Sequence, residues 1–139
     1  GLTRYEWAQN SFSLLDCADA ETVFPVCHEH GPGYEACGPL AGGWLSGKWR
    51  KGADDLSSRR SQMLPDRYDL SLPENQAKLD AADALGSLAD ETGISLIEMA
   101  LAFVIRHPAV TAAIFAYALG LALVVPVFVA RRRHRTPGG

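Results

Sequence analysis

The residue types best suited to chemistry lie in one short stretch, GPLAGGWLSGK, which runs from Gly38 to Lys48. Small residues in a loop let backbone N–H groups approach an anion closely, and a lysine ammonium adds a point charge. A tight turn without a ligand accounts for the same glycines, and the stretch matches neither the Walker pattern nor the dinucleotide fingerprint. The stretch could therefore form an anion-binding loop, whereas a plain turn is the more common explanation of its glycines alone.

Two other runs carry ligand-like residues but point away from a site. In Cys27-His28-Glu29-His30, a helical backbone would place His28 and His30 about 200° apart, so they cannot share one ion. We therefore predict no metal site. Arg59 and Arg60 lie in an otherwise acidic region, so we interpret them as a solvated loop and predict no nucleic-acid binding.

The elements around the Gly38–Lys48 stretch are predicted as a strand, a helix and a second strand. RYEWAQ has the composition of a strand, and it leads into a loop over Gln9 to Leu15. DAETVFPVCHEH is predicted as a helix capped by Asp19, and Gly31 to Gly33 end it. GYEACG follows as a strand, and this order indicates a parallel sheet. Loops at the carboxyl ends of parallel strands bind ligands, which favours the first interpretation.

The middle of the chain is predicted as a long loop followed by two helices. Residues 52–73 show no period and are expected to form a loop. Pro73 opens a helix whose apolar face is formed by Leu79, Ala82, Leu85 and Leu88. Ser95 and Glu98 form a capping box for the next helix, which His107 and Pro108 end.

The charge of the chain is divided unevenly. Residues 1–98 hold eight Lys and Arg against all sixteen Asp and Glu, a net −8, whereas residues 99–139 hold five Arg and no acid. At 139 residues the chain has the length of one domain. Three cysteines are too few for a disulfide framework and no secretory leader opens the chain, which favours a reducing cytoplasm.

Taken together, AQNSFSLLD, FPVCHEHGPGYEACGPLAGGWLSGKW and SLIEMALAFVIRHPAVTAAI resemble the C-terminal half of an aldo-keto reductase. The resemblance covers residues 1–114 in the order and spacing of the family. It implies part of a (β/α)8 barrel that uses NADPH to reduce aldehydes and ketones. RYEWAQ would be its sixth strand, GYEACG its seventh, and TAAIF the start of its eighth.

The resemblance also assigns cofactor-binding residues. The loop after the seventh strand would hold the cofactor pyrophosphate through backbone contacts, a glutamine would hydrogen-bond the nicotinamide carboxamide, and a lysine would end the motif. A plain strand-end polar role is the alternative for the glutamine. The residues at these positions are Gly38, Pro39, Leu40, Ala41, Gly42, Gly43, Gln9 and Lys48.

Departures from the family pattern limit this expectation. The family's catalytic Asp, Tyr, Lys and His come from the first half of the barrel, so no catalytic residue is expected in this sequence. Without the tyrosine, hydride transfer has no proton donor. Cys37 stands where many relatives place an aromatic ring under the nicotinamide. After Ile114 the pattern that clamps the adenosine 2′-phosphate is absent, so the NADP site is expected to be incomplete.

The end of the sequence carries a long apolar run. Residues 109–130 are 22 residues without charge and are followed by RRRHR, the length and flank of a transmembrane helix. A membrane anchor, a displaced reading frame in a GC-rich gene, and a buried core helix are the three interpretations. The expected domains are a half barrel at 1–114, an apolar helix at 115–130, and a basic tail at 131–139.

The expected fold is α/β, a partial (β/α)8 TIM barrel of strands six to eight plus a C-terminal apolar helix. The expected function is that of an NADP-dependent oxidoreductase fragment, inactive alone. The alternatives are a membrane-anchored module that pairs with itself or with a complementary half chain, and a nonfunctional truncated or frameshifted product. A single-pass membrane protein is expected if the apolar run is an anchor, and a cytoplasmic protein otherwise.

Overall fold

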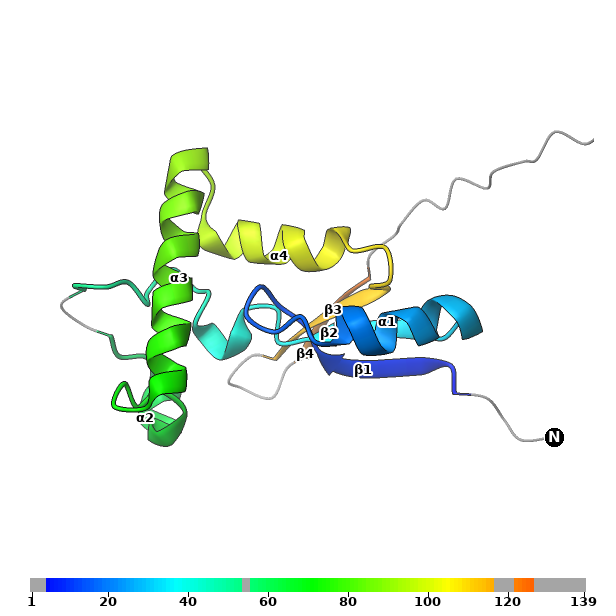
Figure 1. The fold of residues 1–139 in the computed structure, drawn as a ribbon, viewed down its shortest axis with the longest axis horizontal. Coiled ribbons are helices and arrows are strands. Elements are labelled where there is room, and N and C mark those ends of the chain that lie inside the picture. The colour runs from blue at the N-terminus through cyan, green and yellow to red at the C-terminus, as the bar shows by residue number, and fades with distance from the viewer. Residues whose placement is uncertain (1–4, 54–55, 117–121, 127–139) are drawn as a thin grey trace, which may run out of the picture.

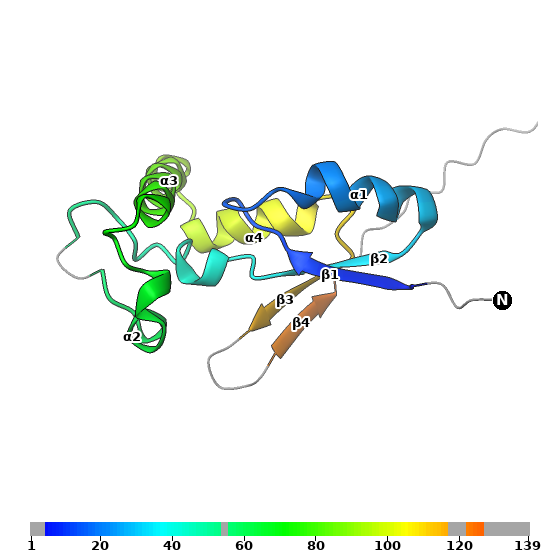
Figure 2. The same cartoon turned by 60° about the horizontal axis from the view of Figure 1, so that its bottom comes forward.

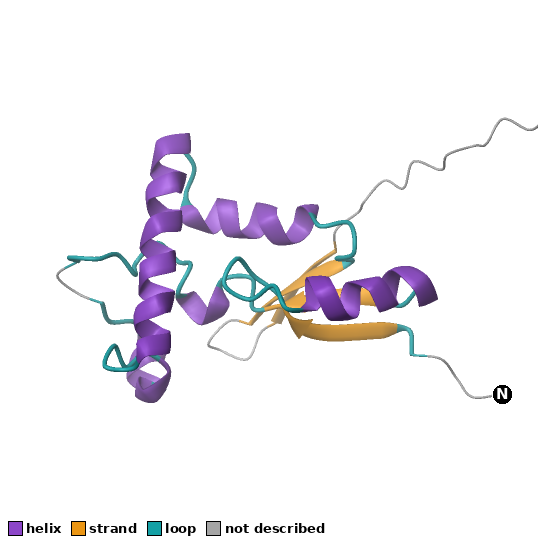
Figure 3. Cartoon of the chain, viewed as in Figure 1, coloured by secondary structure: helices purple, strands orange, loops and turns teal. Residues whose placement is uncertain are grey.

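A computed structural model describes residues 5–53, 56–116 and 122–126 of the chain. Its helices and strands are mixed along the sequence (Figures 1 and 3). Short 3-10 turns at Ala41–Gly43 and Pro65–Arg67 accompany them. The elements in chain order are β1 (Trp7–Ser11), α1 (Asp19–His30), β2 (Gly33–Cys37), α2 (Arg59–Met63), α3 (Pro73–Thr92), α4 (Leu96–Arg106), β3 (Ala112–Ala116) and β4 (Ala122–Pro126).

The sheet has the strand order β1-β2-β3-β4, and its first three strands are parallel. Ser11 pairs with Cys37, which in turn pairs with Ile114, so the carboxyl ends of the three strands share one edge. This arrangement confirms the predicted strand–helix–strand unit and agrees with one part of a (β/α)8 barrel.

The helices α1 and α4 lie on one face of the sheet, and no helix among the described residues covers the other face (Figure 2). Between helices and sheet lies a core of Phe12, Phe24, Tyr34, Val104 and Val110. The rings of Phe24 and Tyr34 meet edge to face at 4.6 Å. Burying these aromatic and aliphatic side chains is the main force that holds the helical layer on the strands.

Helix α1 ends as the sequence predicts but begins differently. Gly31 adopts a φ of 84° and its N–H donates to the Cys27 carbonyl, an αL cap that favours glycine. Asp19 is not the N-cap, which is Ala18 and carries no side-chain cap bond. Instead the Asp19 carboxylate accepts a 2.5 Å hydrogen bond from the buried Tyr34 hydroxyl, because α1 packs directly over β2.

Helices α3 and α4 confirm most of the predicted signals. Pro73 opens α3, and the Ser95–Glu98 capping box at the start of α4 is formed in both directions. The predicted apolar face of α3 is wrong at its last member, because Leu88 is 48% exposed. Gly86 and Ala89 are buried in its place, since small residues let the neighbouring chain approach.

The segment 52–73 is not a plain loop. It contains α2, whose first turn is closed by a capping box between Ser58 and Ser61. The 3-10 turn Pro65–Arg67 follows, and Tyr68 then enters a buried aromatic cluster. The sequence shows no helical period here because α2 has only five residues.

The apolar run at the end of the chain does not form the predicted C-terminal helix in the residues that the structure describes. Strand β4 pairs antiparallel with β3, with Ile114 opposite Val124. An uncharged run containing Val124 and Val125 suits a paired strand as well as a helix, and periodicity alone does not separate the two. Within the described part of the chain, no helix is long and apolar enough to cross a bilayer. The basic tail 131–139 lies outside the described residues.

Candidate functional site

The Gly38–Gly43 segment, hereafter the glycine loop, leaves the carboxyl end of β2 directly. Cys37 is the last residue of β2 and pairs with Ser11 of β1 and Ile114 of β3. The loop therefore starts at the edge where all three parallel strands end. In parallel α/β sheets, this edge is where loops meet ligands.

The backbone of the glycine loop is mostly left-handed. The φ angles of Gly38, Gly42 and Gly43 are 67°, 71° and 110°. Ala41, with a φ of 49°, is the one residue other than glycine with a positive φ among the described residues. Such a conformation costs a side-chain-bearing residue about 1 kcal/mol or more. It persists only where surrounding contacts impose it, so the loop is held in its shape.

Backbone hydrogen bonds between residues three and five positions apart close the loop on itself. The N–H of Ala41 donates to the carbonyl of Gly38 and the N–H of Gly43 donates to the carbonyl of Leu40, both at 2.8 Å. The N–H of Leu45 also donates to the carbonyl of Leu40, at 3.2 Å. Leu40, in the bridge region with a φ of −95° and a ψ of 16°, precedes the left-handed Ala41, and such a change of backbone handedness resembles the turn conformations that form anion-binding concavities.

An aromatic cluster of Trp44, Trp49 and Tyr68 packs behind the glycine loop. The Trp49 and Tyr68 rings stack at 5.3 Å with 14° between their planes, and Trp44 lies 4.4 Å from Trp49. The Tyr68 hydroxyl donates a 2.6 Å hydrogen bond to the carbonyl of Gly42. Burial raises the pKa of Tyr68, so the phenol stays protonated and remains a donor. Tyr68 therefore fixes the orientation of the Gly42 peptide.

The other side of the loop is anchored to the two long helices. Leu45 is fully buried with Ala89, Leu96 and Ala100, and Leu40 packs against this cluster. Arg50 reaches α3 further along, where its Nε lies 3.1 Å from Asp83 Oδ1. The loop thus sits on a surface made by elements that follow it by forty to sixty residues.

A cavity of 450 Å³ opens beside the loop, hereafter the loop cavity. Ala41 and Gly42 of the glycine loop line it, together with residues of β1, the Pro65–Arg67 turn and α3. Its cationic side chains are Arg67 and Lys78, and the Lys78 ammonium donates to Asn75 Oδ1 at 3.1 Å. Its acidic lining residues are Asp16, Asp66 and Glu74. Three acids against two cations give this cavity no net attraction for an anion.

Some of the predicted site residues line the loop cavity and others lie away from it. Ala41 and Gly42 line this cavity, whereas Pro39 of the same loop is buried. Gln9 lies in the middle of β1, two residues before its carboxyl end, and is exposed. Lys48 is exposed five residues after the loop. Neither Gln9 nor Lys48 lines the loop cavity, so that cavity does not bring all predicted residues together.

Sequence reasoning did not find the residues that shape this site from outside the loop. Tyr68 lies in a segment without a period, and Asn75 is a polar residue at the start of an amphipathic helix. Asn75 is only 2% exposed, and its Nδ2 donates to the carbonyl of Asp69 at 3.0 Å. The sequence carries no signal for this role, because asparagine is usually exposed and its burial is visible only in the structure.

Comparison with known proteins finds similarity to a protein family and to a plant protein. The sequence profile of the Aldo/keto reductase family matches residues 3–118. A protein of Arabidopsis thaliana described as a probable voltage-gated potassium channel subunit beta is 32% identical over 108 residues, 76% of this chain. The chain spans 32% of the length of that relative.

Proposed function

Because the chain belongs to the aldo/keto reductase family, we propose that it is an NADP-binding part of an oxidoreductase, with the cofactor pyrophosphate on its glycine loop. The observation that carries the proposal is the left-handed backbone of Gly38 and Ala41–Gly43 at the carboxyl end of β2. A loop held in this shape before binding does not spend binding energy on its own ordering.

The space around the loop fits a ligand that approaches the backbone. A Cβ atom added at Gly38 or at Gly43 would meet nothing within 4 Å, so both positions are open on that side. At Gly42 the added atom would lie 3.3 Å from the Tyr68 hydroxyl, so this glycine makes room for the phenol. The glycines therefore divide into two that give access and one that permits the Tyr68 contact.

Charge favours backbone contacts over side-chain contacts with the phosphates. The loop cavity holds more acids than cations, whereas the glycine loop itself carries no charged side chain. In this proposal the phosphates meet peptide N–H groups of the loop other than those of Ala41 and Gly43, which donate within the loop, and the exposed Lys48 follows as a cation. Gln9, on the uncovered face of the sheet with Glu35 opposite, would hold the nicotinamide carboxamide.

When bound, the cofactor would supply the hydride for reduction of a carbonyl group. Within residues 1–139 the family resemblance assigns no catalytic Asp, Tyr, Lys or His. We therefore propose that this chain by itself binds the cofactor without catalysing reduction. The chain spans about a third of the relative's length, so activity of the whole protein and its substrate are further proposals.

The test is a titration of the chain with NADPH, read by tryptophan fluorescence. Trp44 follows Gly43 directly, and Trp44 and Trp49 are only 4% and 2% exposed, so both report from beside the loop. Gly43→Glu places a carboxylate on the open side of the loop. Gly52→Glu is the matched control, because Gly52 also has a positive φ, 75°, and open space at its Cβ.

Saturable quenching that Gly43→Glu abolishes and Gly52→Glu preserves would support the proposal. Quenching that is equal in both variants would refute the glycine loop as the site. A chain shown by circular dichroism to be folded, yet giving no saturable quenching, would refute cofactor binding itself. Turnover of NADPH with 4-nitrobenzaldehyde, followed by absorbance, is expected to be absent.

A second candidate function is association with another chain through the sheet. In the part of the chain that the structure describes, helices cover one face of the sheet only (Figure 2), and all of β1 except Ala8 is exposed. Strand β1 carries no charge and no proline between Trp7 and Ser11, although such residues commonly protect exposed edges. The relative's name describes a subunit of an assembly. Sedimentation velocity across a concentration series tests this candidate, and a monomer at all concentrations would refute self-association.

A further inference from the structure

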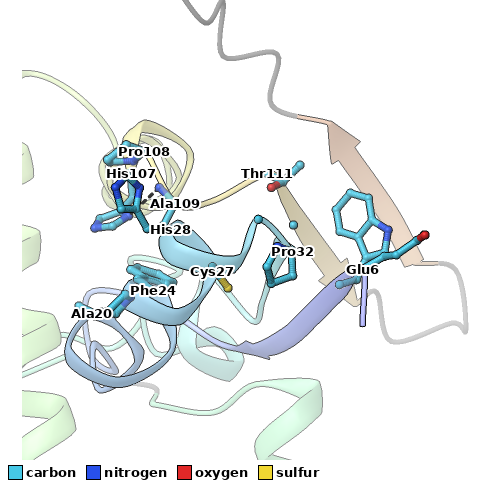
Figure 4. A pocket seen from close by; sticks show the side chains of 14 residues that line it. Glu6, Ala20, Phe24, Cys27, His28, Pro32, His107, Pro108, Ala109 and Thr111 are labelled. Carbon is cyan, nitrogen blue, oxygen red and sulfur yellow. Dashed lines mark hydrogen bonds between the residues drawn. The ribbon is translucent and has the colours of Figure 1, made fainter. Parts of the chain in front are cut away.

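A second cavity lies at the opposite end of the strands from the glycine loop. It has a volume of 720 Å³, which is in the range of small-molecule sites. The amino ends of β1 and β2 and the carboxyl-terminal ends of α1 and α4 surround it (Figure 4). It shares no residue with the glycine loop or the loop cavity, so nothing in the proposed function uses it.

Aromatic rings form much of the wall of this amino-end cavity. Trp7 is 53% exposed, an unusual amount for the largest apolar side chain. Three of its ring atoms lie 2.5 to 3.1 Å from where a Cβ of Gly33 would be, so the indole covers this glycine closely. On the helix-covered side, the rings of Phe24 and His107 pack at 4.4 Å and Phe24 is buried. The indole lies over Gly33 on the opposite face from Tyr34 and Phe24, so the exposed aromatic surface of this cavity is that of Trp7.

His107 adds no positive charge to this wall. Its Nδ1 accepts the N–H of Ala109 at 3.3 Å, which is consistent with a neutral ring protonated at Nε2. Burial also lowers the pKa of His107. The ring is further held by its contact with Phe24, so it presents one fixed, uncharged face to the cavity.

The lining of the cavity has one acidic side chain, that of Glu6, and the exposed Arg106 at the end of α4 lies outside the lining. Glu6 lines it beside Trp7, and the fourteen lining residues include neither lysine nor arginine. Helices α1 and α4 both end here, at His30 and Arg106, and the carboxyl-terminal end of a helix carries a partial negative charge. An anion is disfavoured in this place, and a cation is favoured.

From these observations we propose that the amino-end cavity binds an organic cation, an ammonium group carried on an apolar body. The face of Trp7 would hold the cation, because indole is the strongest aromatic partner for such groups. The Glu6 carboxylate would add Coulombic attraction, and Pro32 beside Gly33 would contact the apolar body. This site is independent of cofactor binding at the glycine loop.

The test uses benzyltrimethylammonium as the probe, with benzyl alcohol and phenylacetate as neutral and anionic comparators that share its ring. Saturation-transfer NMR on the ligand reports binding without relying on any tryptophan of the protein. We expect the cation to bind at least tenfold more tightly than either comparator. Equal binding of the three probes, or no binding of the cation to the folded chain, would overturn the proposal.

Variants locate the site. Trp7→Leu is expected to weaken binding of the cation about tenfold, and Glu6→Gln about threefold with a smaller effect at high salt. The matched controls are Tyr5→Leu and Glu29→Gln, which alter exposed neighbours outside the cavity and should change nothing. If Trp7→Leu fails to fold, Glu6→Gln decides. A loss of binding in the controls as large as in the site variants would refute this location.

Discussion

Gly86 of α3 leaves space for the side chain of Arg50, which binds the segment after the glycine loop to α3. A Cβ atom at this position would lie 2.9 Å from the Arg50 Cζ and closer still to Nη1. Arg50 spreads its guanidinium over α3, with Nε 3.1 Å from Asp83 and Nη1 3.0 Å from Asp90. Its Nη2 also donates to Ser87 Oγ at 3.2 Å. Gly86→Ala must therefore displace the guanidinium.

The expected free-energy change has two opposing parts. Alanine in a helix interior is more favourable than glycine by about 1 kcal/mol. Displacing Arg50, whose side chain is 31% exposed, loses charge-assisted hydrogen bonds that we place at about 1–2 kcal/mol in total, since one partner, Asp90, is 71% exposed. In the natural background Gly86→Ala is thus expected to leave the free energy of unfolding unchanged or lower it by about 1 kcal/mol.

Removing Arg50 should reverse the sign of the change in unfolding free energy that Gly86→Ala causes. In an Arg50→Ala background the space at Gly86 is free, and Gly86→Ala should raise the free energy of unfolding by about 1 kcal/mol. The coupling energy of the double-mutant cycle is therefore about 1–2 kcal/mol. Urea unfolding followed by circular dichroism at 222 nm measures all four proteins, since helices α1, α3 and α4 supply most of the signal.

A control on the same helix separates packing from helix propensity. Ala84 is exposed, so Ala84→Gly should lower the free energy of unfolding by about 1 kcal/mol in both backgrounds. If Gly86→Ala stabilised the chain equally with and without Arg50, Arg50 would not occupy the space over Gly86. The account of how α3 holds the segment after the loop would then be wrong.

Three further perturbations test other contacts. Tyr68→Phe removes the hydroxyl that holds the Gly42 carbonyl, and it should cost about 1 kcal/mol in urea unfolding and weaken NADPH binding; unchanged binding would show that the loop keeps its shape without this bond. Burial lowers the pKa of His107, so the unfolded chain binds the extra proton and stability should fall as pH drops below about 6.5. Thermal melts from pH 7.5 to 5.5 check this, and the His107→Gln variant should show a smaller decrease. Ser95→Ala should lower stability by about 1 kcal/mol through the lost cap. The backbone N–H and then the hydroxyl of Ser95 lower the pKa of Glu98, so the contribution of this carboxylate is lost as pH falls through that lowered pKa; the variant keeps the backbone bond and should show a smaller acid-side loss.

Elements whose signals are local were predictable from the sequence. Gly31 ends α1 because only a left-handed residue continues the chain there, and Ser95 with Glu98 begins α4 because both groups of the capping box lie within one turn. The glycine loop belongs to the same class, since its position follows from a strand ending at Cys37. Each of these depends on residues within four positions of one another.

Features that depend on distant partners were not predictable in the same way. The prediction that Leu88 belongs to the buried face of α3 was wrong because Arg50 and Leu45, about forty residues earlier, decide which side of α3 is buried. Strand β4 was expected as a helix because an uncharged run fits both forms until its partner β3 is known. The part that Tyr68 plays in the site could not be predicted because it depends on a hydrogen bond from its hydroxyl to the carbonyl of Gly42, 26 residues away.

The geometry of the glycine loop follows from these distant contacts more than from its glycines. Ala41 has a left-handed φ without being glycine, so the loop's shape is imposed and not merely permitted. Tyr68 fixes the Gly42 peptide, Leu45 is buried between α3 and α4, and Arg50 binds α3. A ligand that met this loop would find its backbone already arranged. Variants that release Tyr68 or Arg50 should therefore weaken NADPH binding without touching the ligand, whereas Leu88→Ala, on the exposed side of α3, should not.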